Sequence, residues 1–280
     1  MPRQSFTLDR LTLGPEAPLT VVAGPCVLES RQTCLRIGES LRDRCRELGL
    51  NFIFKASFDK ANRSSIHSHR GPGLEQGLTL LAELRRTLGC PVTTDIHEPG
   101  HAAPAAEAVD LLQIPAFLCR QTDLLLAAAQ TGGPVNVKKG QFLSPEEMTR
   151  VVGKLTESGA DQSGILLTER GTFFGYHRLV NDFIALGDLM ELGHPVCFDV
   201  THSTQQPGGQ GHQSGGRPDR APMLARAAVA AGCDAVFLET HPAPASALSD
   251  KATMLPLNRT LSLLEDLARL HEATSPMPPG

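Results

Sequence analysis

A (β/α)8 barrel, in which a closed parallel sheet is surrounded by helices, is the fold that this sequence predicts. Eight short apolar runs recur along the 280 residues, most of them continuous rather than alternating, and helix-like segments separate them. Continuous apolar runs are typical of parallel strands that are buried on both faces. The length and the 41% hydrophobic content suit one large core, so we expect a single domain over residues 1–280.

The expected strands are continuous enough to be placed one by one. They are Leu19–Val27, Asn51–Ala56, Pro91–Ile96, Asp110–Ile114, Pro134–Val137, Gly164–Thr168, Pro195–Val200 and Asp234–Leu238. An open doubly wound sheet is the alternative fold. It usually has a glycine-rich phosphate turn after its first strand, and the segment AGPCVLES at residues 23–30 is not such a turn.

The intervening segments have the apolar spacing of helices. They are expected over residues 30–48, 74–88, 122–130, 144–157, 177–191, 217–231 and 256–272. Ser144-Pro145-Glu146-Glu147 is typical of a capped helix start. Within the extension formed by residues 1–18, Phe6–Leu13 is expected to form a hairpin that closes the lower end of the barrel. Residues 273–280 are expected to form a flexible tail.

Composition argues against several classes of protein. The formal net charge of −4, the absence of Trp and the 4% aromatic content do not favour nucleic-acid binding. No apolar stretch reaches the roughly 18 residues of a membrane span, and the N-terminus lacks the apolar core of a signal peptide. The seven cysteines are irregularly spaced without a CxxC pair. We therefore expect a cytoplasmic protein with reduced thiols.

Polar residues follow every predicted strand at its carboxyl end, which is where barrel enzymes place their chemistry. In chain order these residues are Cys26, Lys55, Asp95 with His97, Gln113, Lys138 with Lys139, Glu169 with Arg170, Asp199 with His202, and Glu239 with His241. General loop polarity is the alternative explanation. We favour a single convergent site, because chance would leave several strand ends apolar.

Cations gather in this expected site although the chain is slightly acidic. Lys55, Lys60, Lys138 and Arg170 would meet at the barrel mouth and would repel each other without an anion between them. A small phosphorylated substrate with a carboxylate would satisfy them. Alternatively, they are rim partners of Asp59, Glu75 and Glu169. The segment 62–65, Asn-Arg-Ser-Ser, suggests a second phosphate pocket, or else an ordinary polar loop.

Four potential metal ligands come from neighbouring strands and the last loop: Cys26, His202, Glu239 and Asp250. A thiolate, an imidazole and two carboxylates suit Zn²⁺ or Fe²⁺, with Mn²⁺ and Co²⁺ as further options, but do not suit Mg²⁺. No compact motif supports the set. Taken alone, Cys26 is better explained as a buried core thiol, and a nucleophile paired with a histidine is a further alternative.

Eight motifs in order resemble the 3-deoxy-D-manno-octulosonate 8-phosphate synthases over about residues 20–250. They are AGPCVLES (23–30), KANRSSIHSHRGPGLEQGL (60–78), TDIHEP (94–99), LLQIPAFLCRQTDLL (111–125), NVKKGQF (136–142), TERGTFFGY (168–176), FDVTHSTQ (198–205) and ETHP (239–242). The resemblance implies a (β/α)8 barrel, usually a homotetramer. It also implies condensation of phosphoenolpyruvate with D-arabinose 5-phosphate for lipopolysaccharide biosynthesis.

The resemblance also implies roles for individual residues. Those matching phosphoenolpyruvate contacts are Lys55, Ser57, Lys60, Gln113, Lys138 and Arg170; those matching arabinose 5-phosphate contacts are Asn62, Arg63, Ser64 and, from a neighbouring subunit, Arg120. Alternatively, Arg120 forms an ion pair with Asp123 of its own chain. Asp95 is expected near the sugar, or else as a structural hydrogen-bond acceptor. Lys138, Arg170, His202 and Asp95 are the expected catalytic residues.

The family has metal-dependent and metal-independent branches, and the independent branch has Asn at the position of Cys26. Because Cys26, His202, Glu239 and Asp250 all match, the chain resembles the metal-dependent branch. The segment 208–216, GGQGHQSGG, matches a mobile lid, and its glycine content fits mobility.

The reaction expected from the resemblance is an aldol-like condensation in which the metal either positions the aldehyde or activates water. A Schiff base at Lys55 or Lys138 is a rival chemistry. The related 3-deoxy-arabino-heptulosonate 7-phosphate synthases are the nearest alternative, but they typically have Lys-Pro-Arg-Thr where this chain has Lys60-Ala61-Asn62-Arg63-Ser64. A barrel that only binds a phosphorylated metabolite is the alternative outside enzymes.

Overall fold

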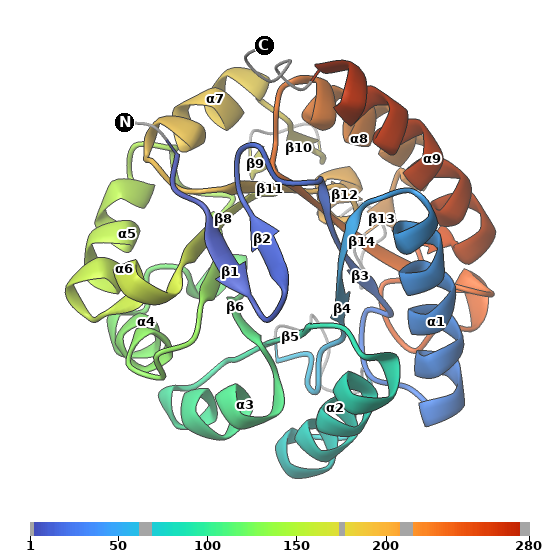
Figure 1. The fold of residues 1–280 in the computed structure, drawn as a ribbon, viewed down its shortest axis with the longest axis horizontal. Coiled ribbons are helices and arrows are strands. Elements are labelled where there is room, and N and C mark those ends of the chain that lie inside the picture. The colour runs from blue at the N-terminus through green and yellow to red at the C-terminus, as the bar shows by residue number, and fades with distance from the viewer. Residues whose placement is uncertain (1–2, 62–68, 174–176, 208–214, 275–280) are drawn as a thin grey trace.

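A closed barrel of parallel strands forms the centre of the molecule (Figure 1). The computed structural model describes residues 3–61, 69–173, 177–207 and 215–274. The barrel strands are β3 (Thr20–Gly24), β4 (Asn51–Lys55), β5 (Val92–Asp95), β6 (Leu111–Ile114), β7 (Val135–Lys138), β8 (Ile165–Glu169), β11 (Val196–Asp199) and β14 (Ala235–His241). They are joined in this order, and β14 pairs in parallel with both β11 and β3, which closes the ring. The predicted fold and all eight predicted strands are confirmed.

Several barrel strands end in a charged residue, so polar side chains belong to the sheet itself. Lys55, Asp95, Lys138, Glu169 and Asp199 are each the last residue of their strand. Buried strands accept these side chains because each one lies at the polar mouth of the barrel, where it has a partner of opposite charge.

Helices surround the barrel, as the ring of coiled ribbons in Figure 1 shows. They are α1 (Arg31–Glu47), α2 (Leu74–Leu88), α3 (Ala102–Ala108), α4 (Thr122–Ala129), α5 (Met148–Glu157), α6 (Ala160–Ser163), α7 (Phe183–Glu191), α8 (Ala221–Ala230) and α9 (Leu257–Thr274). Local interactions determine where two of these helices begin or end. Ser30 caps α1 by accepting from the backbone N–H of Thr33, and Gly89 ends α2 with a left-handed φ of 61°.

The helix prediction for 177–191 is wrong over its first six residues. Residues Leu179–Val180 form β10, which pairs with β9 (Thr172–Phe173), and α7 begins only after Asp182. The Asp182 side chain accepts hydrogen bonds from the backbone N–H groups of Ile184 and Ala185, so it fixes the start of the helix.

One further helix prediction differs from the structure, and two short helices have no predicted counterpart. Ser144 does not cap α5, which starts at Met148. The Glu147 side chain instead accepts from the Ser144 backbone N–H over 3.0 Å and holds a preceding turn. The sequence does not predict α3, because its residues AAPAAEA have little polar contrast from which a helical spacing could be recognised. It does not predict α6 either, which has only four residues.

The N-terminal hairpin was predicted correctly. Strands β1 (Phe6–Leu8) and β2 (Leu11–Leu13) pair antiparallel and lie across the barrel in Figure 1. Leu8 and Leu13 pack in one buried cluster with side chains from the barrel strands, including Ile53, Leu166 and Phe237. The hairpin therefore covers the amino-terminal end of the barrel and leaves the carboxyl-terminal end for chemistry.

Three short strands near the barrel mouth complete the described part: β12 (Gln205–Gln206), β13 (Gly215–Gly216) and β15 (Leu255–Pro256). No described helix combines the length and apolar composition that crossing a bilayer requires.

Candidate active site

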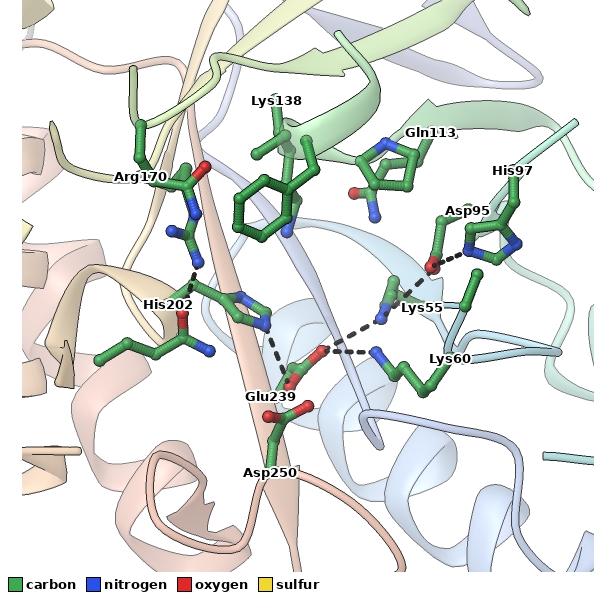
Figure 2. A pocket seen from close by; sticks show the side chains of 16 residues that line it. Lys55, Lys60, Asp95, His97, Gln113, Lys138, Arg170, His202, Glu239 and Asp250 are labelled. Atoms are coloured by element: carbon green, nitrogen blue, oxygen red, sulfur yellow. Dashed lines mark hydrogen bonds and ion pairs between the residues drawn. The ribbon is translucent and has the colours of Figure 1, made fainter. Parts of the chain in front are cut away.

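A cavity opens at the carboxyl ends of the strands, and the residues predicted from the strand ends meet there (Figure 2). The predicted residues that line it are Lys55, Lys60, Asp95, Gln113, Lys138, Arg170, His202, Glu239 and Asp250. They are up to 195 positions apart along the chain, counted from position 55 to position 250. His97, another predicted strand-end residue, also lines the cavity. The predicted convergence is confirmed for these residues, whereas the strand-end residues Cys26, Lys139, Glu169, Asp199 and His241 do not line the cavity.

The three lysines of the cleft have acidic partners, but these are not the rim acids considered from the sequence. Lys55 donates to Glu239 Oε1 over 3.1 Å, and Lys60 lies 3.7 Å from the same oxygen. Lys138 donates to Asp199 over 2.5 Å. Asp59 instead pairs with Arg70, and Glu169 pairs with Lys139. The rim-partner alternative is therefore wrong.

Glu239 is fully buried beside Lys55 and Lys60. Burial would raise the pKa of its carboxyl, but the combined charges of Lys55, Lys60, His202 and Lys138 outweigh burial and hold the pKa below the usual value. Glu239 is therefore ionised at neutral pH. Its second oxygen, Oε2, has no hydrogen-bond partner in the described residues.

Lys138 is held from two sides. Its ammonium group lies 3.5 Å from the ring centroid of Phe237, in addition to its contact with Asp199. Burial, offset in part by Asp199, lowers the pKa of Lys138. The Lys55 ammonium group also faces this ring, 5.3 Å from the centroid of Phe237. Phe237 therefore makes cation–π contacts with both lysines.

Asp95 and Ser57 form a support behind Lys55. The Ser57 hydroxyl accepts from Lys55 Nζ over 2.9 Å and donates to Asp95 Oδ1 over 2.5 Å. Asp95 also contacts His97 Nε2 over 3.2 Å. Ser57 is fully buried and is not among the residues that line the cavity, whereas Asp95 is.

Gln113 is oriented by a chain of hydrogen bonds. Thr168 donates to Asn136 Oδ1 over 2.6 Å, and Asn136 donates to Gln113 Oε1 over 3.2 Å. Because the carbonyl oxygen of Gln113 is occupied in this way, its amide N–H groups remain for the cavity. Arg170 donates to Gln205 over 2.6 Å, while its Nη1 is buried without a hydrogen-bond partner in the described residues. Both Gln113 and Arg170 therefore offer donors to an anion.

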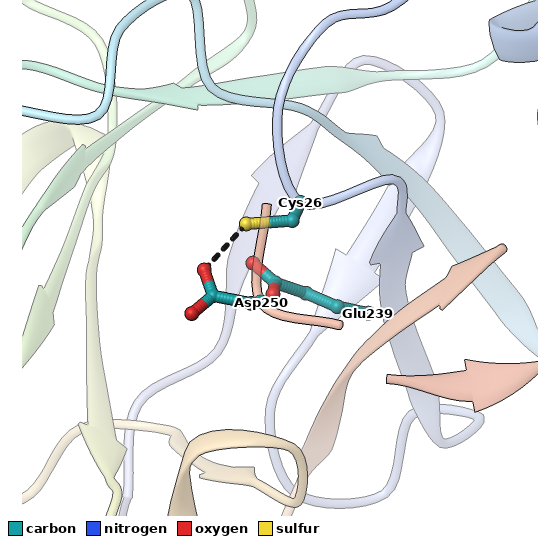
Figure 3. Close-up of side chains that lie close together, drawn as sticks. All are labelled: Cys26, Glu239 and Asp250. Carbon is teal, nitrogen blue, oxygen red and sulfur yellow. Dashed lines mark hydrogen bonds between the residues drawn. The ribbon is translucent and has the colours of Figure 1, made fainter. Parts of the chain in front are cut away.

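Three of the four predicted metal ligands form one tight group (Figure 3). Single ligand atoms of Cys26, Glu239 and Asp250 all lie within 4.8 Å of one another. The Cys26 thiol donates to Asp250 Oδ2 over 2.7 Å, and its sulfur lies 3.2 Å from the Ser249 hydroxyl. Asp250 has a φ of 46°, which is uncommon outside glycine and is compatible with its carboxylate lying beside the thiol.

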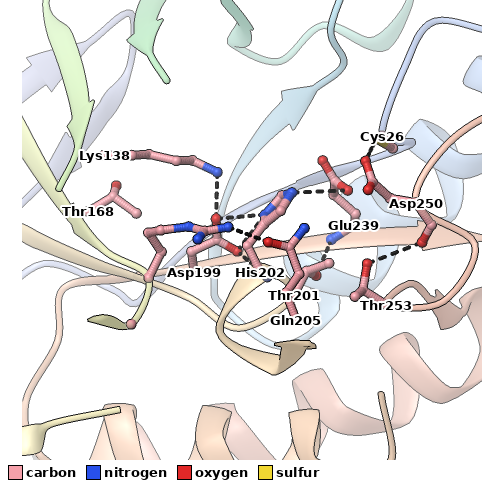
Figure 4. Close-up of polar contacts among 12 residues, drawn as sticks. Cys26, Lys138, Thr168, Asp199, Thr201, His202, Gln205, Glu239, Asp250 and Thr253 are labelled. Atoms are coloured by element: carbon pink, nitrogen blue, oxygen red, sulfur yellow. Dashed lines mark hydrogen bonds and ion pairs between the residues drawn. The ribbon is translucent and has the colours of Figure 1, made fainter. Parts of the chain in front are cut away.

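His202, the fourth predicted ligand, reaches this group through Glu239 (Figure 4). Its Nε2 lies 3.7 Å from Glu239 Oε2, and its Nδ1 contacts Asp199 Oδ2 over 2.8 Å. The unpartnered Glu239 oxygen is therefore close to an imidazole nitrogen, and the same carboxylate belongs to the group with the thiol and Asp250. This mixed donor set fits a divalent metal such as Zn²⁺ or Fe²⁺.

Of the two alternatives for Cys26, the structure is compatible with the core thiol and disfavours the nucleophile. Cys26 does pack with Ala247 and Met254 in a small buried cluster, as a core thiol would. A nucleophilic role is disfavoured, because burial and then the carboxylates of Asp250 and Glu239 raise the pKa of the thiol well above its usual value. A nucleophile needs the thiolate at neutral pH.

Some predicted residues are not placed in the cleft. Asn62, Arg63 and Ser64 lie outside the described residues, as do positions 208–214 of the predicted lid and 275–280 of the predicted tail. Arg120 is exposed just before α4, and no ion pair with Asp123 is found among the described residues.

Several residues that hold the site together had no predicted role. Asp199 was expected only as a strand end, although its spacing of three residues from His202 was a usable signal. Phe237 was expected only as an apolar strand residue. Lys139 and Glu169 form a buried ion pair of 3.4 Å. The two are 30 positions apart (169 − 139) and meet only because β7 pairs with β8, so no local pattern predicts their contact.

Together, the barrel and its cleft define an enzyme site of the (β/α)8 class, with cations for an anionic substrate beside potential metal ligands. The model of the DAHP synthetase I family matches residues 4–275. Proteins named 2-dehydro-3-deoxyphosphooctonate aldolase are similar over nearly the whole chain. The one from a Synechococcus species is 54% identical over 95% of this chain and 93% of its own. Those from Desulfatibacillum aliphaticivorans and Bradyrhizobium diazoefficiens are 51% and 53% identical, over 95% and 93% of this chain and 97% and 92% of their own.

The chain therefore belongs to the DAHP synthetase I family and, within it, to the 2-dehydro-3-deoxyphosphooctonate aldolases. 3-Deoxy-D-manno-octulosonate 8-phosphate synthase, the family that the eight sequence motifs resemble, is another name for the same enzyme. The resemblance is confirmed, and the alternative of a barrel that only binds a metabolite is not supported.

Proposed function

We propose that this protein condenses phosphoenolpyruvate with D-arabinose 5-phosphate and water, giving 3-deoxy-D-manno-octulosonate 8-phosphate and phosphate for lipopolysaccharide biosynthesis. The observation that carries the proposal is the convergence of Lys55, Lys138 and Arg170 on one cavity beside the group of Cys26, Glu239 and Asp250. The names of the relatives support the eight-carbon product.

Phosphoenolpyruvate would lie between the buried cations. Lys138 and Arg170 line the cavity on β7 and just beyond β8, while Lys55 and Lys60 line it from the side of β4. Arg170 offers the unpartnered Nη1 for an oxyanion, and Gln113 offers its amide N–H groups. Ser57 contributes by holding Lys55 in place.

The bond changes follow from the two substrates. C3 of phosphoenolpyruvate attacks the C1 aldehyde of the sugar, so a carbon–carbon bond forms and the aldehyde oxygen takes a proton. Water adds at C2, and the resulting phosphohemiketal releases phosphate by breaking its C2–O bond. Lys138 and Arg170 would stabilise negative charge on the transferring oxygens, which preorganised buried cations do without reorganisation. Asp95 would face the sugar.

We propose that Cys26, His202, Glu239 and Asp250 hold a divalent metal, with Zn²⁺ or Fe²⁺ favoured over Mn²⁺ and Co²⁺. A bound metal supplies Lewis acidity, either to the aldehyde oxygen or to the attacking water. The unpartnered Glu239 oxygen supports this assignment, because a buried carboxylate oxygen needs a partner.

A Schiff base at Lys138 or Lys55 is the rival chemistry. The ammonium group of Lys138 is bound to Asp199, and that of Lys55 is bound to Glu239 and Ser57, so both are occupied as cations. We expect borohydride with substrate to leave no covalent adduct on either lysine. A mass increase on a peptide containing one of them would establish the rival.

The seven-carbon alternative is distinguished by the aldose. Purified protein is supplied with phosphoenolpyruvate and either arabinose 5-phosphate or erythrose 4-phosphate, and phosphate release is measured. We expect turnover with the five-carbon sugar and little with the four-carbon sugar. No turnover with arabinose 5-phosphate would refute the proposal.

We further propose a cytoplasmic homotetramer in which Arg120 reaches the sugar phosphate of a neighbouring subunit. Arg120 is exposed, and the exposed Phe117 lies in the turn just before it. The seven cysteines are all free, which fits a reducing compartment. Mixing inactive Arg120→Ala and Cys26→Ala subunits tests the arrangement. Mixed tetramers should regain part of the activity if Arg120 acts across subunits, and none if it acts within its own chain.

A further inference from the structure

Asp199 is a buried carboxylate at the end of β11 that contacts two functional groups at once (Figure 4). Its Oδ2 accepts from Lys138 Nζ over 2.5 Å and lies 2.8 Å from His202 Nδ1. Its Oδ1 accepts from the backbone N–H of His202 over 2.9 Å. One carboxylate therefore joins a cation of the cleft to a side chain of the predicted metal group.

The geometry of this contact is set by the backbone. His202 begins a short 3₁₀ turn, His202–Thr204, directly after β11. Because the turn begins at His202, its imidazole lies beside Asp199, which is three residues earlier in the chain. The hydrogen bond from the His202 backbone N–H to Asp199 Oδ1 helps to orient the carboxylate. Phe237 lies beside both neighbours, with its ring centroid 3.5 Å from the Lys138 ammonium group and 5.8 Å from the centroid of the His202 ring.

The contact also selects the tautomer of His202. An ionised carboxylate only accepts hydrogen bonds, so the Nδ1 that faces Asp199 carries the proton. Nε2, the other ring nitrogen, then lies on the side of Glu239 Oε2, 3.7 Å away. A histidine ligand generally donates its other nitrogen to such an acceptor, which fixes its ring and raises its basicity.

We propose that Asp199 is a positioning residue that orients both Lys138 for phosphoenolpyruvate and His202 for the metal. The inference rests on the proposed function for the identity of the two ligands. It goes beyond that function by assigning a residue that touches neither ligand, and by predicting that one substitution weakens both.

The test uses Asp199→Asn, which keeps the shape and one acceptor oxygen but removes the charge. Zn²⁺ affinity is measured by competition with a chromophoric chelator, and phosphoenolpyruvate binding by calorimetry, so neither readout needs turnover. We expect Zn²⁺ affinity to fall by roughly 10- to 100-fold. Phosphoenolpyruvate affinity should fall as well.

Asp234→Asn is the matched control. Asp234 is also a buried carboxylate with a cation partner, since Arg3 lies 2.6 Å away, but it precedes β14 at the opposite end of the barrel. It should leave both affinities unchanged. If folded Asp199→Asn protein retains either affinity at the wild-type level, the shared role is refuted.

A second measurement needs no variant of Asp199. In ¹⁵N-histidine-labelled wild-type protein without metal, His202 should show the tautomer with its proton on Nδ1, and added Zn²⁺ should shift the Nε2 resonance. His202→Gln assigns the signals. A proton on Nε2 in the neutral ring would overturn the inference, even if the enzyme turns over its substrates as proposed. Failure of turnover with the expected tautomer would instead refute only the proposed function.

Discussion

Lys55 donates to one oxygen of Glu239 over 3.1 Å, while the other oxygen of this buried carboxylate has no hydrogen-bond partner among the described residues. Glu239 therefore stands between the proposed phosphoenolpyruvate site and the proposed metal site. Lys60 shares the occupied oxygen at 3.7 Å. Without a metal, the ammonium groups of Lys55 and Lys60 both interact with Oε1 of Glu239.

This relationship predicts that metal and phosphoenolpyruvate bind cooperatively. A divalent ion at Glu239 would draw the carboxylate away from Lys55 and Lys60 and leave both cations for the substrate. We expect the metal to tighten phosphoenolpyruvate binding by roughly 10-fold, and phosphoenolpyruvate to tighten metal binding by the same factor. Calorimetric titrations in both orders check this, and equal dissociation constants with and without metal would contradict it.

Replacing Cys26 should separate metal binding from folding. Cys26→Ala removes one proposed ligand from the group with Glu239 and Asp250, so metal content and activity should both fall to near background. Cys34→Ala is the control, because Cys34 is equally buried but lies on α1 in the main core. It should keep metal and activity. Elemental analysis, turnover and circular dichroism of both variants distinguish a lost ligand from a lost fold.

Metal binding should become tighter as pH rises. Burial and then the carboxylates of Asp250 and Glu239 raise the pKa of the Cys26 thiol, so the metal-free protein holds that proton at neutral pH. Binding to the thiolate releases it, and each released proton gives about a 10-fold gain in affinity per pH unit. Calorimetry between about pH 7 and pH 8.5 in buffers of different ionisation enthalpy counts the protons. An absence of proton release would be incompatible with Cys26 as a ligand.

The buried pair of Lys139 and Glu169 should stabilise the ends of β7 and β8. Glu169 also accepts from the backbone N–H groups of Arg170 and Gly171, over 2.9 Å and 2.6 Å. Lys139→Met leaves this carboxylate without its cation and should lower the free energy of unfolding by about 3–5 kcal/mol. Adding Glu169→Gln should recover much of the loss, as urea denaturation would show. If the double variant is no more stable than the single one, the pair is not the cause.

The fold was largely predictable because strand burial leaves a direct trace in the sequence. Continuous apolar runs such as Asn51–Ala56 admit few other structures, and the eight runs together define the barrel. The errors were local. The start of α7 depends on the Asp182 cap, and α3 is too rich in alanine to show a helical face.

The site was predictable only as a set of residues. The positions of the strand ends predict many of the side chains that line the cavity, because a parallel barrel brings its strand ends together whatever their separation in sequence. Their partners were not predictable in the same way. Lys138 and Asp199 are 61 residues apart, and only the packing of β7, β8 and β11 reveals that one neutralises the other. The unpartnered oxygen of Glu239 is likewise visible only in three dimensions.

Whether the condensation depends on a metal at Cys26, His202, Glu239 and Asp250 can be decided by phosphate release in the presence of a chelator. Phosphoenolpyruvate and arabinose 5-phosphate are supplied to protein treated with a tight chelator, then to the same protein after Zn²⁺ or Mn²⁺ is restored. We expect phosphate release to stop on chelation and to return with the metal. Equal rates before and after complete metal removal, verified by elemental analysis, would show that the reaction proceeds without a metal.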